Sequence, residues 1–326
     1  MSLSGSERIR LFYGRFQTTD QVLVVINADP DAIACALAVK RLLWKKVAGV
    51  TIAHINVIDR PDNLAMVRLL GVKLVHIDTV DTGRFSRFVL VDSQPEHNER
   101  LAGLPPADVV IDHHPAAVKN AAAYTDIRPD YGATATILTE YLKAARIKPS
   151  QKLATGLYLG IKTDTSNFER HAAMEDVRAF QYIFRYVNIH LARKIEQAEI
   201  KPEFLAFFSR ALERKVMRNR KIFAHLGRVT NPDVCVIVAD FFMRVSSVQW
   251  SIVSGIYDNR LVVILRNDGA RRDAGRAAKK AFESMGSAGG HKSMARAEIP
   301  LDKVLGVLKN KKDDREMSRW IIGKLR

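Results

Sequence analysis

The N-terminal half of the chain alternates short apolar runs with stretches of helical spacing. The apolar runs are rich in β-branched residues and predict strands at 22–26, 52–58, 73–77, 88–91 and 108–111. Helical spacing of apolar residues predicts helices at 31–47, 62–70, 133–146, 151–162 and 174–188. Nearly continuous apolar strands that alternate with helices predict a parallel sheet covered on both faces. Ligands of such sheets bind beyond the carboxyl ends of the strands.

The C-terminal half of the chain follows a different pattern. Residues 191–221 have helical spacing without an intervening strand and end in a charge-dense segment, which predicts a helical connector. Beyond it we predict strands at 222–228, 233–239 and 261–265, a helix near 274–284 and a glycine-rich loop at 286–291. The predicted α/β protein therefore has a parallel-sheet domain at 1–190, the connector at 191–221 and a smaller α/β domain at 222–326, with the active site in the cleft between the domains.

Composition narrows the class of protein. With 47% hydrophobic and 26% charged residues, the 326-residue chain is neither disordered nor fibrous. The two cysteines are far apart and have no metal-site spacing, which excludes a disulfide framework or zinc finger and favours a reducing compartment. No apolar stretch reaches the roughly 18 residues of a membrane span, and the first ten residues lack the apolar core of a signal peptide. We expect a cytoplasmic protein without a membrane partner.

Positive charge is concentrated in the C-terminal part. The net charge is +16 overall, and residues 1–190 hold 23 basic and 20 acidic residues against 28 and 15 in residues 191–326. Much of this charge belongs to solvated helix surfaces. The asymmetry between the two parts nevertheless favours a polyanionic partner such as a nucleic acid, a nucleotide or polyphosphate.

Carboxylate and imidazole side chains follow several of the predicted strands. They are Asp29 and Asp31 after strand 22–26, Asp92 after strand 88–91, Asp112, His113 and His114 after strand 108–111, and Asp164 at a helix end. Because a parallel sheet gathers its carboxyl ends at one edge, these groups would repel one another unless divalent cations neutralised them. Mixed Asp and His ligands suit Mn²⁺ better than Mg²⁺, and two such ions about 4 Å apart polarise a phosphoryl oxygen and generate hydroxide from water.

Each of these residues also has a structural interpretation. Asp29, Asp31 and Asp92, taken singly, are typical helix N-caps, and an isolated His113 is typical of a hydrogen-bonded core histidine. Their coincidence at one edge of one predicted sheet favours a metal site.

The motifs at these positions resemble those of the DHH phosphoesterase superfamily. They are DPDAIA at 29–34, VDS at 91–93, IDHHP at 111–115 and GIKTDT at 160–165, and GSAGGH at 286–291 resembles the GGH signature of the DHH-associated C-terminal domain. The resemblance covers nearly the whole chain and is closest in type to the RecJ-like nano-RNases that also act on 3′-phosphoadenosine 5′-phosphate. It implies an Mn²⁺-dependent hydrolase, with two ions in each active site and Mg²⁺ as an alternative.

The resemblance also implies roles for the motif residues. Asp31, Asp92, His113 and Asp164 would hold one metal ion, Asp92 would bridge to a second ion held partly by Asp29, Asp112 would support the cluster, and His114 would donate to the scissile phosphate. Many family members have a histidine four residues before the first motif aspartate, where this chain has Val25, with Asn27 as the nearest polar side chain. Asn27 or water would complete the second metal site, or that ion would bind more weakly.

A second group of candidate residues lies in the C-terminal part. Between 261 and 298 the chain carries Arg266, Arg271, Arg272, Arg276, Lys279, Lys280, Lys292 and Arg296 around the glycine-rich segment. The backbone N–H groups of Gly289 and Gly290 can approach a phosphate closely, and arginine can bind it in a bidentate manner. An ordinary turn would also explain the glycines. The resemblance implies that Arg266 and His291 hold the non-scissile phosphate or terminal nucleotide of the substrate.

These observations predict a metal-dependent phosphoesterase, an exonuclease-type phosphodiesterase that hydrolyses short oligonucleotides or nucleotide bisphosphates. Aromatic side chains for stacking along a strand are sparse, so we expect a short oligonucleotide or nucleotide substrate, with a homodimer as one possible assembly. Two alternatives remain open at this point. One is an exopolyphosphatase or pyrophosphatase, and the other is a catalytically weakened nucleotide-binding protein, suggested by Val25.

Overall fold

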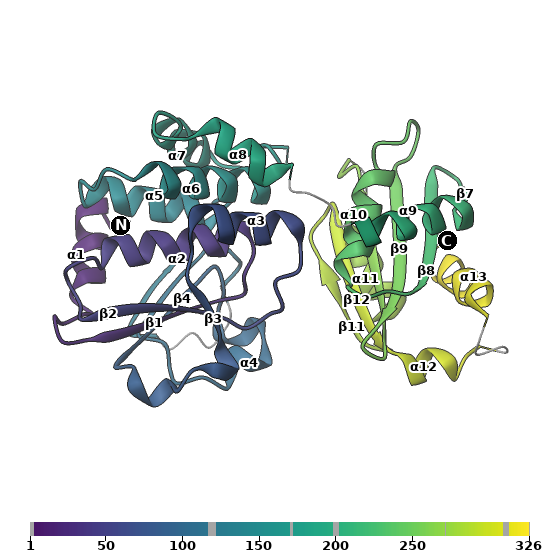
Figure 1. The fold of residues 1–326 in the computed structure, drawn as a ribbon, viewed down its shortest axis with the longest axis horizontal. Helices are drawn as coiled ribbons and strands as arrows, with labels where there is room; N and C mark the ends of the chain where they lie inside the picture. Colours follow the sequence, from purple (N-terminus) through teal and green to yellow (C-terminus); the bar gives the residue numbers. More distant parts are fainter. Residues whose placement is uncertain are drawn as a thin grey trace. The chain divides into compact units, whose positions relative to one another are not determined.

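The computed structural model describes residues 3–116, 122–169, 172–197, 202–270, 272–308 and 313–325. The chain divides into two compact units, Met1–Glu199 and Ile200–Arg326, and each contains its own six-stranded sheet (Figure 1). The predicted α/β fold class, with a parallel sheet and then a second sheet, is confirmed. Among the described residues, no helix combines the length and apolar character that a membrane crossing requires.

The sheet of the first unit is parallel throughout and has the strand order β3-β2-β1-β4-β5-β6. Its strands are β1 (Gln21–Ile26), β2 (Gly49–His54), β3 (Leu74–His76), β4 (Arg87–Val91), β5 (Val109–Asp112) and β6 (Tyr124–Ile127). Alternate side chains of β1 enter different cores, because successive residues of a strand point to opposite faces. Val24 and Ile26 lie in the larger core, whereas Leu23 and Val25 lie in a smaller one.

Helices cover both faces of this sheet unequally (Figure 1). They are α1 (Gly5–Tyr13), α2 (Pro30–Leu42), α3 (Pro61–Leu70), α4 (Glu99–Ala102), α5 (Thr134–Ala144), α6 (Gln151–Asp164), α7 (Met174–Phe184) and α8 (Ile189–Glu196). The larger core lies between the sheet and a layer that includes α1, α2, α5 and α6, and α4 lies on the opposite face. The sequence patterns did not predict α1 or β6.

The second unit has a mixed sheet with the strand order β11-β12-β10-β9-β8-β7. Its strands are β7 (Val216–Arg218), β8 (Lys221–Arg228), β9 (Trp250–Tyr257), β10 (Arg260–Asn267), β11 (Ser287–Gly290) and β12 (Met294–Pro300). Neighbouring strands are antiparallel except for the parallel pair β8 and β9. The prediction missed β9 and β12, and the predicted loop at 286–291 is largely strand β11.

In the described part of this unit the helices are α9 (Pro202–Arg214), α10 (Asp233–Phe242), α11 (Ala274–Phe282), α12 (Leu301–Leu305) and α13 (Asp314–Lys324). The predicted strand at 233–239 is wrong, because these residues form α10. The Asn231 side chain accepts a hydrogen bond from the backbone N–H of Asp233 at 2.7 Å, and Val234, Val238 and Phe242 enter one core at helical spacing. Packing of this apolar stripe outweighs the strand preference of a run rich in valine.

The region predicted as a helical connector, 191–221, is not one continuous helix. It contains most of α8, the whole of α9 and then β7, which pairs antiparallel with β8. Helix α8 packs on α3 and α6 of the first unit, whereas α9 packs on α10 and β8 of the second. The strand β7 is a difference from the purely helical prediction.

Candidate metal centre

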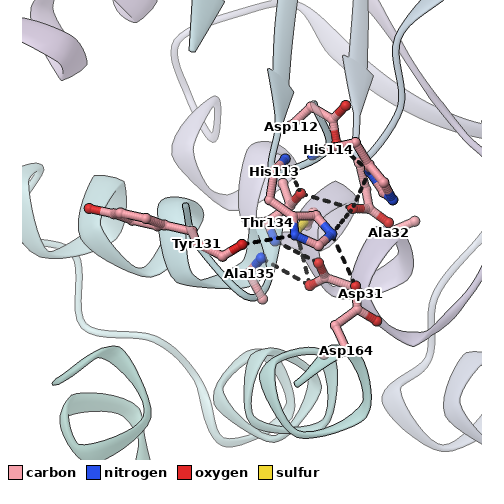
Figure 2. A network of polar contacts seen from close by, with 12 residues as sticks. Asp31, Ala32, Asp112, His113, His114, Tyr131, Thr134, Ala135 and Asp164 are labelled. Atoms are coloured by element: carbon pink, nitrogen blue, oxygen red, sulfur yellow. Dashed lines mark hydrogen bonds and ion pairs between the residues drawn. The ribbon is translucent and has the colours of Figure 1, made fainter. Parts of the chain in front are cut away.

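Three adjacent parallel strands bring the predicted acidic and histidine residues to one edge of the first sheet. Strands β1, β4 and β5 are neighbours, so the residues that follow them meet at their carboxyl ends. Ligand atoms of Asp31, Asp92, His113 and Asp164 lie within 4.8 Å of one another. Figure 2 shows Asp31, His113 and Asp164 of this set pointing toward one another. The structure thus brings together side chains that are up to 133 residues apart in the sequence. We call these four residues the carboxylate–histidine cluster.

Asp31 is held by the first turn of helix α5. Its two carboxylate oxygens accept hydrogen bonds from the backbone N–H groups of Thr134 at 2.7 Å and Ala135 at 2.9 Å. Helix α5 needs such acceptors, because its N-cap residue, Ala133, has no side-chain oxygen. Asp31 is fully buried, and it therefore ties the start of α2 to the start of α5.

Asp92 and Thr134 form a second link between the strand ends and α5. Asp92 has a backbone φ of 57° directly after β4, and its Oδ1 accepts a hydrogen bond from the Thr134 hydroxyl at 2.8 Å. The same hydroxyl oxygen accepts the backbone N–H of His113 at 3.2 Å. Thr134 thereby fixes two members of the cluster at once. A left-handed backbone at a non-glycine residue is strained, and strain of this kind is typical of functional sites.

The imidazole of His113 has the orientation of a metal ligand. Its Nδ1 lies 3.1 Å from the carbonyl oxygen of Tyr131, an acceptor that favours a proton on Nδ1. Its Nε2 is buried, lies 3.3 Å from Oδ2 of Asp164 and 3.7 Å from Oδ1 of Asp92, and has no hydrogen-bond partner among the described residues. A buried nitrogen aimed at two carboxylates fits a divalent cation between them.

The electrostatics of the cluster agree with this fit. Burial, together with repulsion from Asp164, raises the pKa of Asp29 to about 6 and that of Asp31 well above its usual range. Burial and repulsion from Asp31 raise the pKa of Asp92 in the same direction. Burial lowers the pKa of His113, but Asp164 and Asp31 outweigh it and raise the pKa to about 9. Without a cation the cluster therefore retains protons, and a bound divalent cation would displace them.

Gly160 allows helix α6 to approach Asp31 closely enough for Asp164 to join the cluster. A Cβ atom at Gly160 would lie 2.7 Å from Oδ1 and 3.1 Å from Cα of Asp31, and 3.2 Å from Cβ of Ala135. Both distances to Asp31 are shorter than normal van der Waals contacts, so a side chain at this position would push the two helices apart. Asp164 is the last residue of α6, one turn beyond Gly160.

Asp112 and His114 form a pair that adjoins the cluster, since ligand atoms of His114, Asp92 and His113 also lie within 4.8 Å of one another. The Asp112 Oδ1 lies 2.8 Å from Nδ1 of His114, and its Oδ2 accepts a hydrogen bond from the Gln94 amide at 2.7 Å. Burial raises the pKa of Asp112, but the bonds from His114 and Gln94 prevail and lower it to about 2. Asp112 is thus an anion at neutral pH that orients His114. His97 joins them, since ligand atoms of His97, Asp112 and His114 also lie within 4.8 Å of one another.

Asp29 stands beside the cluster and caps helix α2. Its side chain accepts the backbone N–H of Ala32 at 2.9 Å. The preceding turn is fixed by Asn56, whose side chain exchanges hydrogen bonds of 2.7 and 3.0 Å with the backbone of Ala28. Asn27 is exposed, and Val25, at the position where many DHH proteins have a histidine, is fully buried in the smaller core.

The prediction missed four residues that shape this region: Gln94, Asn56, His97 and Thr134. Gln94 and His97 lie two and five residues after Asp92, so proximity to a predicted ligand was a usable signal. Thr134 lies at the start of a predicted helix, where a hydroxyl is expected to cap its own helix. In the structure it bonds Asp92 instead, which the helix-start pattern does not indicate.

The predicted substrate-binding residues lie at one end of the second sheet. Arg266 lies in β10 opposite Met294 of β12. Gly289 and Gly290 lie in β11, where they pair with Arg296 and Ala295 of β12. The Arg266 Nε lies 2.7 Å from Oδ1 of Asp240 in an ion pair. His291 follows β11 and is exposed, and Arg271 lies outside the described residues.

Backbone packing explains part of the glycine-rich segment. Gly290 has a φ of 147°, and a Cβ there would lie 2.5 Å from Cα of Ala295 and still closer to the carbonyl oxygen of Met294. A Cβ at Gly289 would meet only Cε of Lys279, at 3.8 Å, which is an ordinary contact. Gly290 is therefore required by the β11–β12 hairpin, whereas nothing in the described fold requires glycine at position 289.

The strand-end position, the buried carboxylates and the ligand-like histidine of this α/β unit fit a divalent cation. Residues 21–161 match the DHH family, N-terminal domain, and this part of the chain belongs to that family. The superfamily resemblance seen in the motifs is thereby confirmed.

Comparison with other proteins extends the similarity beyond this domain. An uncharacterized protein of Methanocaldococcus jannaschii is 34% identical over 281 residues, which cover 86% of this chain and 58% of that protein. The chain thus spans less than two thirds of its relative. An exopolyphosphatase-related protein from Bacteroides fragilis has the same fold, with a TM-score of 0.75 at 16% identity over 98% of this chain and 95% of that one. Exonuclease RecJ bound to manganese has a TM-score of 0.53 at 14% identity, over 100% and 96%.

Proposed function

We propose that the chain is a cytoplasmic, metal-dependent phosphoesterase of the nano-RNase type, which hydrolyses phosphoester bonds in short oligonucleotides or nucleotide bisphosphates. The observation that carries this proposal is the carboxylate–histidine cluster, with four ligand atoms within 4.8 Å of one another at the carboxyl edge of the sheet. The match of residues 21–161 to a phosphoesterase family supports the same chemistry.

The proposed metal ligands are Asp31, Asp92, His113 and Asp164, with Asp29 contributing to a second ion. Mixed carboxylate and imidazole donors favour Mn²⁺, with Mg²⁺ as the alternative. When bound, divalent cations at such sites act as Lewis acids toward a phosphoryl oxygen and make water a better nucleophile. The side chains themselves are pre-positioned, because Thr134 and the first turn of α5 hold Asp31 and Asp92 at fixed hydrogen-bond distances.

Asp112 and His114 are proposed to act on the phosphoryl group. The Asp112 carboxylate holds Nδ1 of His114 at 2.8 Å, so the imidazole ring has a fixed orientation at the edge of the cluster. His114 would donate a hydrogen bond to the negative charge that develops on phosphoryl oxygens in the transition state. Gln94 is a positioning residue here, since it holds the second oxygen of Asp112.

The second unit is proposed to bind the substrate. Arg266, Gly289, Gly290 and His291 would hold a non-scissile phosphate or a terminal nucleotide, and the excess of 28 basic over 15 acidic residues in 191–326 favours polyanions. Gly289 is the best supported of the glycines for this role, because its lack of a side chain has no structural explanation in the hairpin.

The test is a comparison of initial rates with Mn²⁺ on labelled di- to decanucleotides, 3′-phosphoadenosine 5′-phosphate and polyphosphate. We expect Asp92→Asn to abolish turnover of the preferred substrate, and Arg266→Ala to raise KM with a smaller effect on kcat. Asp81→Asn, at an exposed position outside the cluster, serves as the control and should keep the wild-type rates. Equal losses of kcat in the Asp92 and Arg266 variants would contradict the proposed division of roles. Faster hydrolysis of polyphosphate than of any nucleotide substrate would contradict the proposed substrate class and favour an exopolyphosphatase.

One observation favours a second candidate function, a nucleotide-binding protein with weakened catalysis. Val25 is fully buried among apolar side chains, so that position provides no second-metal ligand. Nucleotide binding in the presence of Mn²⁺, with one metal ion bound per chain and no hydrolysis of any substrate in the panel, would support this candidate over the enzyme.

A further inference from the structure

A separate hollow lies within the second unit, at the end of the sheet where β8 and β9 begin. Its volume is about 470 Å³, which is within the range of small-molecule sites. Three chain segments line it: Asn219 to Lys221 at the β7–β8 turn, Gln249 and Trp250 at the start of β9, and Asp268, Ala270 and Arg272 after β10. None of these residues belongs to the carboxylate–histidine cluster, and only Arg272 is among the cationic residues that the sequence analysis grouped around the glycine-rich segment.

Backbone hydrogen bonds join the three segments and so preform the hollow. The N–H groups of Gln249 and Trp250 both donate to the carbonyl oxygen of Arg220, at 2.8 and 3.2 Å. The N–H of Asp268 donates to the carbonyl oxygen of Gln249 at 3.2 Å. The side-chain amide of Asn267 donates to the backbone carbonyl oxygen of Arg272 at 3.0 Å. A ligand would therefore meet a wall whose backbone is already ordered, which reduces the entropy lost on binding.

The lining is strongly cationic. Arg220, Lys221 and Arg272 face a single carboxylate, Asp268, whose Oδ1 accepts the N–H of Ala270 at 3.1 Å within its own turn. Lys221 donates to the carbonyl oxygen of Leu325 at 2.6 Å. Burial, and then the charge of Arg272, lower the pKa of Lys221, so Lys221 and Arg272 are close enough to repel each other.

The two arginines remain available to an anion. Within the described part of the chain, neither the Arg220 nor the Arg272 guanidinium has an ion-pair or hydrogen-bond partner, and both side chains are exposed. In contrast, Arg266 is already paired with Asp240. Guanidinium groups at the rim of a hollow can bind phosphate in a bidentate manner.

Trp250 adds an aromatic surface beside these cations. Its side chain is half-buried, packing partly against the core while also lining the hollow. Indole rings held in this way stack on nucleobases, and the side-chain amides of Asn219 and Gln249 can exchange hydrogen bonds with a base edge. A site for inorganic phosphate or polyphosphate would have no use for the ring.

We propose that this hollow binds a nucleotide unit, with the base on Trp250 and the phosphate between Arg220 and Arg272. The ligand chemistry is that of a base joined through its sugar to a phosphate, which either a mononucleotide or a single-stranded nucleic acid supplies. The site goes beyond the proposed hydrolysis, since binding here requires neither a metal ion nor turnover. It would retain or recruit nucleotides through the second unit.

The test is calorimetric titration of the full chain in the presence of EDTA, which separates binding from hydrolysis. The ligands are adenosine 5′-monophosphate, adenosine, tripolyphosphate and single-stranded pentadenylate. Arg220→Ala and Arg272→Ala should each weaken binding of the monophosphate by about tenfold, the typical loss for a charge-assisted hydrogen bond. Trp250→Ala should weaken it at least about fivefold, and Trp250→Phe should retain most of the affinity. Arg260→Ala is the matched control, because this exposed arginine lies at the opposite end of β10.

The outcomes separate the proposal from simple attraction between charges. Unchanged affinity in Arg260→Ala with losses in the three hollow variants would support the site. Tighter binding of pentadenylate than of the monophosphate would assign it to nucleic acid, and equal binding would assign it to mononucleotides. The proposal is overturned if tripolyphosphate binds as well as the monophosphate and Trp250→Ala has no effect, or if no ligand binds. Because none of these readings involves Mn²⁺, they remain valid whether or not the chain hydrolyses its substrate.

Discussion

Gly160 offers the sharpest test of how the cluster is assembled, because one methyl group should separate α6 from Asp31. In Gly160→Ala the new Cβ would lie 2.7 Å from the Asp31 carboxylate and 3.1 Å from its Cα. The Cα belongs to the backbone of α2 and cannot rotate away, so the helices must shift. Overpacking of this kind costs about 1–3 kcal/mol, partly offset by the helix preference of alanine over glycine, about 1 kcal/mol.

Gly156 provides a matched control on the same helix, one turn earlier. The closest atom to a Cβ there would be the end of a flexible side chain, Cδ1 of Leu70 at 3.2 Å, and Cε of Met66 and Cβ of Ala34 would lie at an ordinary 3.6 Å. Gly156→Ala gains the same helix preference, so the difference between the two variants isolates the contact with Asp31. We expect Gly160→Ala to be less stable than Gly156→Ala by about 1–3 kcal/mol.

Urea unfolding of both variants measures that difference, and Mn²⁺ titration followed by initial rates measures its effect on the site. Displacement of Asp164 relative to Asp31 by as little as about 1 Å is expected to lower the rate by about 100-fold, whereas Gly156→Ala should keep the wild-type rate. Equal stability and equal activity in the two variants would refute the argument, because the close approach of α6 would then have no part in forming the cluster.

Two further predictions concern other buried polar groups. Thr134→Val keeps the shape of the side chain but removes the hydroxyl that donates to Asp92, and should lower metal affinity or activity by about 10- to 100-fold, as measured by Mn²⁺ titration and rates. Thr139→Val, which removes a buried hydroxyl in the same helix that bonds only a helix carbonyl, is the control and should have little effect. Burial lowers the pKa of His225 in the folded chain to about 4. As the pH falls, this histidine is therefore protonated in the unfolded chain before it is protonated in the folded chain. The free energy of unfolding should therefore fall by about 3 kcal/mol as the pH decreases from about 6.5 to 4, and this part of the slope should be absent in His225→Gln if the assignment is correct.

The parallel sheet of the first unit was predictable because its strands are buried on both faces. Runs such as the one ending at Ile26 have no polar alternation, and helical stretches separate them, so the sequence pattern matches the architecture. The same reasoning failed at 233–239, where α10 has an equally apolar, β-branched sequence. Its helical form depends on a stripe of contacts with the second sheet, and a local pattern does not contain that information.

The meeting of Asp92, His113 and Asp31 could also be predicted, since strand order alone determines which carboxyl ends are neighbours. The contribution of Thr134 could not. Its hydroxyl acts on a residue 42 positions away, and only the direction of the first turn of α5 brings the two together. For Asp31 the sequence suggested either a metal ligand or a helix cap, and the structure shows that these two roles do not exclude each other. Asp31 accepts the N–H groups of a helix other than its own and also lies in the cluster.

The two glycines of the β11–β12 hairpin allow a final distinction between fold and substrate binding. Gly290→Ala should destabilise the second unit whether or not a ligand is present, because the new Cβ would overlap the backbone of Met294 and Ala295. Gly289→Ala has room for its methyl group beside Lys279, so its free energy of unfolding should stay within about 0.5 kcal/mol of the wild type. If the backbone at position 289 approaches a substrate phosphate, Gly289→Ala should nevertheless raise KM with kcat nearly unchanged. A stable Gly289→Ala variant with wild-type KM would show that the glycine-rich segment serves the hairpin alone.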